Sequence, residues 1–541
     1  MSDRAIAIIF FVLVIVLTLG ITVWAARRNK STSDHYVAGG KISGWQNGLA
    51  ISGDYLSAAS LLGVVGTIAL NGFTGFYLSI GFLVTFLVLL LLVAEPMRNL
   101  GKYTFADMLA SRFNTSSIRS VAALSTVAIC MFYMMAQLNG AGAVIGLLLG
   151  LPYALSVMII GTLMTIYIVA GGMVATTYIQ IVKAVLLMIS ILILSIFVLA
   201  NYDFNPVALF AAVEDEVGTE ALVPPPPDGL LAGLDLISLN IALVLGTAGL
   251  PHILIRFLTV PDAKTARSSL VMAIWIFSIF YLLTPILGYG ATLLVGRDAI
   301  SAASAGGNLA TPQLASALGG PILFAFISAV IFATIMAVVS GLVVAASSAF
   351  AHDFYTNVIR GGEATEREQL KAARYTAIGI AVAAIILAIP LQSLNVAFLV
   401  ALAFAIAASA NVPVILLTIY WKRFNTTGAI AGMLVGLISS VVLVLLSPSV
   451  LTGVTPAADV VPLIPVDAIN PFKNPALFSV PLGFLACFLG TILGGSSADR
   501  EIREGRQVSY DEIYVRSLTG ISNVEQEIRG ATSRENREPR S

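Results

Sequence analysis

The chain has 541 residues, of which 58% are hydrophobic and only 11% are charged, and its formal net charge is zero. A soluble core is excluded, because several apolar runs are long enough to cross the ~30 Å hydrocarbon layer, which takes about 20 residues. The balanced charge indicates no nucleic-acid partner. The two cysteines, Cys130 and Cys487, lie inside apolar runs, which argues against a disulfide or a thiolate metal site.

The apolar runs predict an all-α polytopic membrane protein with about thirteen transmembrane helices. The approximate limits are 5–26, 46–70, 73–95, 119–150, 153–170, 174–200, 235–258, 268–295, 313–350, 372–389, 392–421, 428–447 and 477–495. The first run is longer than the core of a signal peptide, so we expect an uncleaved anchor with the N-terminus outside. An odd number of spans then places the C-terminus inside.

The distribution of basic residues supports this topology through the positive-inside rule. The loop 201–234, which we expect outside, contains acidic residues but no Lys or Arg. Most basic residues fall on the expected inner side, among them Arg98, Lys102, Arg112 and Lys264. We therefore expect a multi-pass protein of the plasma (inner) membrane, surrounded by lipid.

Two predicted spans are interrupted near their middles, the first at residues 51–55 and the second at residues 246–252. Each opens a run of five apolar segments, and paired interrupted helices are typical of the midplane binding site of an inverted-repeat transporter. Backbone without helical hydrogen bonds is costly at membrane depth unless it lines a cavity or is buried in protein. The two breaks therefore indicate where the functional site lies.

This pattern divides the chain into six parts. We expect an extra N-terminal helix with an inner loop, a first five-helix repeat, an acidic outer loop, a second five-helix repeat, two peripheral helices and a charged cytoplasmic tail. The respective boundaries are 1–45, 46–200, 201–234, 235–421, 422–495 and 496–541. The tail is polar and is expected to be mostly disordered, with one amphipathic turn around residues 510–518.

Four stretches carry a resemblance to a known family. Residues 246–257 resemble the G-x-x-G-x-P-H-x-x-x-R-F signature of the sodium:solute symporters, and residues 53–58 resemble the Asp-x-x-Ser-Ala break of its first core helix. Residues 171–175 resemble its Gly-Gly turn, and residues 413–429 its tenth core helix. The similarity extends over residues 5–495.

Within that family, residues 246–260 and 171–177 most resemble the acetate permease branch, which carries short monocarboxylates. The resemblance implies a five-plus-five inverted repeat of the amino-acid-transporter (LeuT-like) type. Residues 46–200 would form one half of the repeat and residues 235–421 the other. The paired breaks alone indicate the same architecture.

Asp54 is an acidic residue well inside a hydrophobic span, where an unpaired carboxylate costs about 2.5–3.5 kcal/mol on insertion scales. This cost favours a site for a coupling cation or proton. The alternative is a carboxylate that caps the helix break by accepting backbone N–H groups. Ser57 could add an oxygen ligand or satisfy a neighbouring carbonyl.

The substrate site is expected at the second break, with Gly53 contributing from the first. A break at Gly246 and Gly249 frees N–H groups at a half-helix N-terminus, whose partial positive charge suits a small carboxylate. The alternative is a simple kink. Tyr133, Gln137 and Asn139 form a polar patch on the third core helix. Such a patch borders a substrate cavity or supplies interhelical hydrogen bonds.

His252 and Arg256 lie four residues apart near the predicted inner end of their helix, where we expect an inner gate rather than a proton relay. Lys183 lies about two turns into its span, where a lysine can snorkel to the surface or pair with a carboxylate.

The coupling ion is predicted from a departure from the family pattern. The resemblance implies adjacent Ser or Thr ligands for sodium in the eighth core helix, but the matching positions are Ala337 and Val338. Thr334 and Ser340 remain, so that a sodium site at Asp54, Thr334 and Ser340 stays possible. A proton needs no coordination shell, and Asp54 could carry it alone. The sequence therefore favours a proton over sodium.

The leading functional prediction is a secondary active symporter for short monocarboxylates such as acetate, propionate or pyruvate, without a cofactor other than the coupling ion. One alternative is a sodium-coupled amino-acid or sugar symporter of the same fold. Another is a transporter-like ligand sensor. Catalytic arrangements such as H-E-x-x-H or a P-loop are absent from the sequence, so we expect no enzyme. The sequence carries no prediction of oligomeric state.

Overall fold

The computed structural model describes residues 3–26, 31–224, 229–451, 469–505 and 507–521. Within these ranges the protein is all-helical, and the one β-bridge pairs Phe113 with Gln507. Eleven of the described helices are long and apolar enough to cross a membrane, or twelve if one bent pair is counted as a span. A shorter apolar helix, Tyr153–Thr165, lies within the predicted span 153–170.

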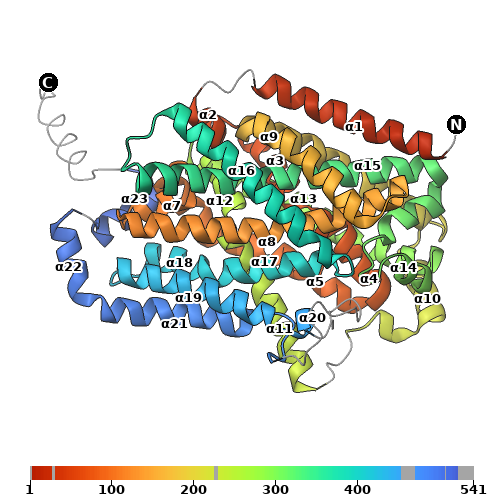
Figure 1. The fold of residues 1–541 in the computed structure, drawn as a ribbon. Helices are drawn as coiled ribbons and strands as arrows, with labels where there is room; N and C mark the ends of the chain where they lie inside the picture. The colour runs from red at the N-terminus through yellow and green to blue at the C-terminus, as the bar shows by residue number, and fades with distance from the viewer. Residues whose placement is uncertain (1–2, 27–30, 225–228, 452–468, 506, 522–541) are drawn as a thin grey trace, which may run out of the picture.

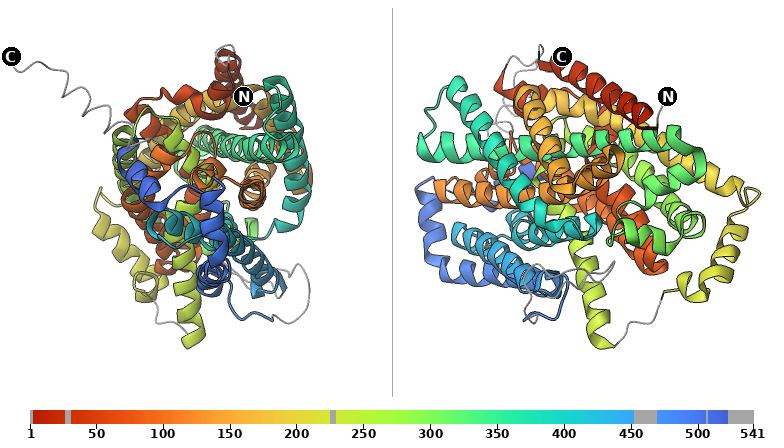
Figure 2. Two further views of the ribbon diagram at one scale, coloured as in Figure 1. Left: turned by 90° about the vertical axis from the view of Figure 1, so that its left-hand side faces the viewer. Right: turned by 45° about the vertical axis from the view of Figure 1, so that its right-hand side comes forward.

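The helices pack side by side across Figure 1 and form a rounded bundle when viewed end-on in Figure 2. The elements that cross or half-cross the bundle are α1 (Asp3–Ala26), α3 (Gly44–Tyr55), α4 (Val65–Asn71), α5 (Phe73–Val88), α6 (Ala94–Leu100), α8 (Ser116–Leu149), α9 (Tyr153–Ala200), α11 (Leu230–Gly246), α12 (Pro251–Leu258), α13 (Ala263–Leu294), α15 (Ala310–Ser348), α16 (Glu366–Ala388), α17 (Val396–Ala410), α18 (Val412–Tyr420), α19 (Thr426–Leu445) and α21 (Ala476–Leu493).

Shorter helices lie at the two ends of the bundle. In Figure 1, α2 (Thr32–Val37), α7 (Phe105–Ala110), α22 (Gly495–Arg503) and α23 (Tyr510–Thr519) lie at the left. At the right lie α10 (Pro206–Val217) and α14 (Arg297–Ala303). We refer to these as the α23 end and the α10 end. The α23 end contains Arg98, Arg112 and Lys422, so the positive-inside rule predicts it to be the cytoplasmic side.

The first broken span bends three residues later than the sequence suggested. Residues 51–55 still belong to α3, and the chain leaves the helix at Leu56, whose ψ is 100°. Ser57 then caps the following helical segment, because its hydroxyl accepts from the backbone N–H of Ala59 at 3.2 Å. The two halves of the span meet at an angle of 56°.

The second break lies where the sequence predicted it. Helix α11 ends at Gly246, a single 3-10 turn covers Thr247–Gly249, and Leu250 is extended with ψ 114°. Pro251 then opens α12, which is a favoured position for a residue without a backbone N–H. The inverted-repeat expectation of two interrupted helices is therefore confirmed.

The predicted Gly-Gly turn lies inside α9. Gly172 has φ 62° and ψ −173°, a conformation that costs glycine little and other residues much more. This residue separates the two halves of α9 and explains why the sequence predicted two spans, 153–170 and 174–200.

The tail is more ordered over its described part than expected, because α22 and α23 are helices and the predicted turn at 510–518 lies within α23. Arg112 connects the tail to the end of α18. Its buried guanidinium donates to the carbonyl groups of Thr418 at 2.6 Å and Phe424 at 2.8 Å, where α18 has ended and its last carbonyls lack helical partners. The backbone carbonyl of Arg112 accepts from Val508, just before α23.

Candidate functional site

An ion pair joins the two broken spans. Arg256 on α12 donates from Nε to Oδ2 of Asp54 on α3 at 3.0 Å, and both side chains are 0% exposed. The same guanidinium donates to the hydroxyl of Thr177 at 2.9 Å and to the side-chain oxygen of Gln180, both on α9. We call these four residues the ion-pair cluster. They tie α3, α9 and α12 together at a depth that no solvent reaches.

The cluster adds a contact that the sequence did not predict. Asp54 is paired with Arg256, which the sequence placed at an inner gate, and both side chains are buried. The two residues are 202 positions apart in the sequence, and the opposed breaks bring them together. A buried charge is tolerated when it is paired and hydrogen-bonded, which is the case here. The second carboxylate oxygen of Asp54 has no partner among the described residues and faces Gly341 of α15, where an added Cβ would lie 2.7 Å from it.

Lys183 on α9 lies beside this cluster and does not snorkel. Its side chain is 1% exposed, and its ammonium donates to the backbone carbonyl of Gly53, the residue before Asp54. Lys183 also lines a small crevice whose other walls are almost entirely apolar. These walls are formed by Val14, Leu17, Thr18 and Ile21 of α1, Ile179, Val182 and Leu186 of α9, and Ala333 of α15.

The hydroxyl groups of α15 make few contacts with the cluster. Ser340 donates to the carbonyl of Ala337 in its own helix at 2.7 Å, and the buried Thr334 hydroxyl has no partner among the described residues. The carbonyl of Ala337 also accepts from the side-chain amide of Gln180 at 3.3 Å. Ala337 and Val338 are fully buried and provide no side-chain oxygen.

A sodium ion at Asp54, Thr334 and Ser340 would lie near two positive side chains, those of Arg256 and Lys183. A hard cation is bound by several oxygen atoms whose lone pairs are free. The second carboxylate oxygen of Asp54 and the hydroxyls of Thr334 and Ser340 have free lone pairs, since Ser340 donates its hydrogen bond, but the charge of Asp54 is already neutralised by Arg256. The nearest carbonyl on α3, that of Gly53, already accepts from an ammonium group.

A second group of polar residues gathers at the two breaks. Tyr133 on α8 donates to the hydroxyl of Ser57 at 3.4 Å, and the side-chain oxygen of Gln137 accepts from the N–H of Ala58 at 3.4 Å. The ring of Tyr133 packs edge-on against the ring of His252 at 5.2 Å. We call Ser57, Tyr133, Gln137 and His252 the break cluster.

The break cluster contains buried polar atoms that the described residues do not pair. The amide nitrogen of Gln137 has no hydrogen-bond partner among them, and neither ring nitrogen of His252 has one. Phe404 of α17 closes the cluster with its ring 5.9 Å from that of Tyr133. Buried polar atoms are nearly always paired, so unpaired atoms of this kind indicate a place for a polar ligand.

The predicted glycines and Asn139 contact neighbouring segments closely. A Cβ on Gly246 would lie 2.7 Å from the carbonyl oxygen of Phe404, and one on Gly249 or Gly53 would collide with the backbone of α17 or α9. These glycines therefore allow close helix contact. Asn139 donates to the carbonyls of Leu391 and Leu394, which matches the interhelical alternative.

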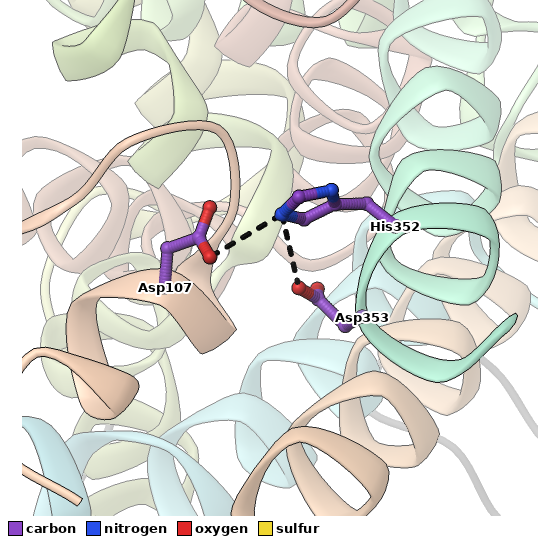
Figure 3. Close-up of side chains that lie close together, drawn as sticks. All are labelled: Asp107, His352 and Asp353. Atoms are coloured by element: carbon purple, nitrogen blue, oxygen red, sulfur yellow. Dashed lines mark hydrogen bonds and ion pairs between the residues drawn. The ribbon is translucent and has the colours of Figure 1, made fainter. Parts of the chain in front are cut away.

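A further polar cluster lies at the α23 end (Figure 3). Asp107 of α7, with His352 and Asp353 after α15, places three ligand-type atoms within 4.8 Å of one another. Arg119 of α8 lies 2.8 Å from Asp107 and 3.4 Å from Asp353, and it supplies the positive charge there. Burial alone would raise the pKa of Asp107, but its hydrogen bond to His352 and the two positive neighbours outweigh burial and hold the pKa below its usual range.

An all-helical membrane bundle in which two interrupted helices meet is the architecture of inverted-repeat secondary transporters. The chain belongs to the sodium:solute symporter family, whose model matches residues 35–436. It is 56% identical over 521 residues to the uncharacterized symporter YwcA of Bacillus subtilis, covering 96% of this chain and 99% of the relative. It is 46% identical over 532 residues to the monocarboxylic acid transporter of Corynebacterium glutamicum, covering 94% of each.

Solved structures confirm the fold class. A Na+-coupled sialic acid symporter in a substrate-bound, outward-open state aligns with a TM-score of 0.69 at 17% identity, over 91% of this chain and 97% of that one. Mhp1, a nucleobase-cation-symport-1 family transporter in a closed conformation with bromovinylhydantoin bound, aligns with a TM-score of 0.54 at 12% identity, over 91% and 99%. The protein therefore has the LeuT-like fold.

Sequence reasoning placed His252 at a gate and missed its contact with Tyr133, as well as the part that Thr177 plays in the ion-pair cluster. One signal was present for the ion pair. Asp54 and Arg256 carry opposite charges in two spans that were already expected to meet. No such signal was present for Thr177 and His252, because neither residue type is unusual near a helix break.

Proposed function

We propose that the chain is a secondary active symporter that imports short monocarboxylates, such as acetate, propionate or pyruvate, together with a proton. The carrying observation is the set of buried polar atoms in the break cluster that have no partner among the described residues, the Gln137 amide nitrogen and the two ring nitrogens of His252. The relative in Corynebacterium glutamicum, described as a monocarboxylic acid transporter, supports the same substrate class.

The chemistry of the break cluster suits a small carboxylate. The amide of Gln137 and one ring N–H of His252 can donate to its oxygen atoms, and hydrogen bonds to a charged group are about twice as strong as neutral ones. His252 also lies in the first turn of α12, where the helix dipole favours negative charge. The rings of Tyr133 and Phe404 provide an apolar boundary for a short carbon chain.

The amino-acid alternative is weaker on the same geometry. An amino acid would bring an ammonium group that needs an acceptor, and the nearby carboxylate of Asp54 is already paired with Arg256. The sodium-coupled alternatives would place a cation near the guanidinium of Arg256 and the ammonium of Lys183, whose positive charges repel it.

Competition in proteoliposomes tests this proposal. The purified full chain should take up labelled pyruvate, and unlabelled acetate and propionate should compete while amino acids and sugars do not. Gln137→Leu should raise KM about 10-fold or more, because a lost hydrogen bond to a charged group is worth roughly 1.5–3 kcal/mol. Gln313→Leu, the same change on α15 away from the break cluster, is the matched control. Displacement of the label by an amino acid or a sugar instead would contradict the proposal.

A further inference from the structure

We propose that Lys183 carries the coupling proton, its ammonium group taking the place between α3 and α15 that a sodium ion would otherwise need. This inference rests on the proposed function, since it assigns the proton of that symport to one side chain. It differs from the expectation drawn from the sequence, in which Asp54 carried the proton.

The position of Lys183 is the first observation. Helices α1, α3 and α15 all pack against α9, so a side chain on this face of α9 is enclosed by three neighbours (Figure 1). The ammonium donates to the Gly53 carbonyl on α3, while its stem lies against Ala333 of α15 and apolar side chains of α1. A positive charge at this point is therefore provided by the chain itself.

The second observation is that Asp54 already forms an ion pair. Its carboxylate is paired with Arg256 at 3.0 Å, and an arginine does not lose its proton in proteins. A proton added to Asp54 would leave the guanidinium without its counter-ion in a fully buried position, which is strongly unfavourable. Among the residues that the structure describes, Lys183 has no ion-pair partner in direct contact, so its proton can be exchanged without breaking the ion pair.

Charge counting links the proton to the substrate. Asp54 and Arg256 together are neutral, so the buried region has a charge of zero when Lys183 is a neutral amine and plus one when it is an ammonium. The isolated buried charge is costly, and a bound monocarboxylate would compensate it. Substrate binding therefore favours protonation of Lys183, and protonation favours substrate binding, as linkage requires.

The groups around Lys183 do not supply another counter-ion. Asp54 on α3 is the charged group that acts on Lys183. On α12, His252 is acted on by Asp54 and Arg256. Cys130 and Tyr133 on α8 lie near Asp54. The side chains that α1 and α15 place around Lys183 are not titratable.

The protonation of Lys183 also affects the contact between α9 and α3. As an ammonium, Lys183 makes a charge-assisted hydrogen bond to the Gly53 carbonyl, and such bonds are about twice as strong as neutral ones. Once the proton leaves for water on the inner side, the neutral amine holds α3 less tightly. One proton bound from the outer side and released on the inner side accompanies one monocarboxylate, and no net charge moves.

The test compares exchange with accumulation in proteoliposomes containing the purified full chain. Lys183→Met should still exchange internal for external labelled pyruvate, because exchange needs no net movement of protons. The variant should not accumulate pyruvate in response to an inward proton gradient. In the wild type, the ratio of internal to external pyruvate should rise up to about tenfold for each unit of pH difference. Lys183→Gln serves as a second variant. Leu186→Met, on the same helix and against the same apolar neighbours, is the control and should accumulate as the wild type does.

The outcomes separate this inference from the proposed function. Accumulation by both lysine variants at the wild-type level would overturn the role of Lys183 and leave the symport itself intact. If both variants are folded but have lost exchange as well as accumulation, the inference is also overturned, because Lys183 would then be needed for translocation in general. A wild type that neither exchanges nor accumulates any monocarboxylate overturns the proposed function and this inference with it.

Discussion

Removal of the Asp54 carboxylate should destabilise the protein strongly. In Asp54→Asn the buried guanidinium of Arg256 loses its counter-ion, and Lys183 beside it adds a second positive group. Breaking a buried pair by removing one partner costs about 3–5 kcal/mol, because the other charge remains buried and uncompensated. We expect the free energy of unfolding to fall by about this amount and concentrative uptake to be lost.

Removal of the Arg256 charge should lower the free energy of unfolding by less. In Arg256→Gln the carboxylate of Asp54 remains, but Lys183 lies nearby and can neutralise it, so the buried region has no net charge. The double variant should likewise be less destabilised than Asp54→Asn. The measurement is a denaturant titration of purified protein in mixed micelles. Asp511→Asn, which removes an exposed carboxylate paired with Lys422, is the control and should change the free energy by at most about 1 kcal/mol.

Two results would refute this reasoning. Asp54→Asn could prove as stable as the exposed control, which would mean that the ion pair contributes little. Arg256→Gln could prove more damaging than Asp54→Asn, which would mean that Lys183 does not compensate the carboxylate.

Three further predictions concern other parts of the molecule. Gly249→Ala should reduce the yield of folded protein, because the new Cβ would collide with the backbone of Ala407, whereas Gly379→Ala, with open space around it, should not; equal yields measured by size-exclusion chromatography would contradict the packing role. His252→Phe should raise KM for pyruvate without lowering the melting temperature, and an unchanged KM would remove His252 from the substrate site. Asp107→Asn should lower the melting temperature by a constant amount between roughly pH 5 and 8 and by less below about pH 3.9. The reason is that a carboxyl whose pKa is depressed in the folded state stabilises the protein above its unfolded pKa and loses this contribution in acid. A difference that grows in acid would contradict the last prediction.

The sequence predicted the fold because its main determinants are local. Spans of about 20 apolar residues and the composition of the breaks can be read directly from the chain. The second break was placed correctly because Pro251 is favoured in the first turn of a helix and follows two glycines. The first was placed three residues early, since Gly53 suggested a break although it serves close contact with α9.

The site was predicted less completely, because its contacts join distant segments. Asp54 was identified from its charge alone, but nothing in the sequence says that Arg256 lies 3.0 Å from it. Tyr133 and Gln137 were correctly placed on one face by their four-residue spacing. The same argument included Asn139, which instead binds carbonyls of another helix, since spacing cannot distinguish a ligand contact from an interhelical one.

The central claim, proton-coupled import of a monocarboxylate, is tested most directly by imposing pH and sodium gradients separately on proteoliposomes that contain the purified chain. Labelled acetate or pyruvate is followed after correction for passive diffusion of the free acid. The account predicts accumulation with an inward proton gradient at equal sodium. Accumulation driven by inward sodium at equal pH, and absent with a proton gradient alone, would contradict it.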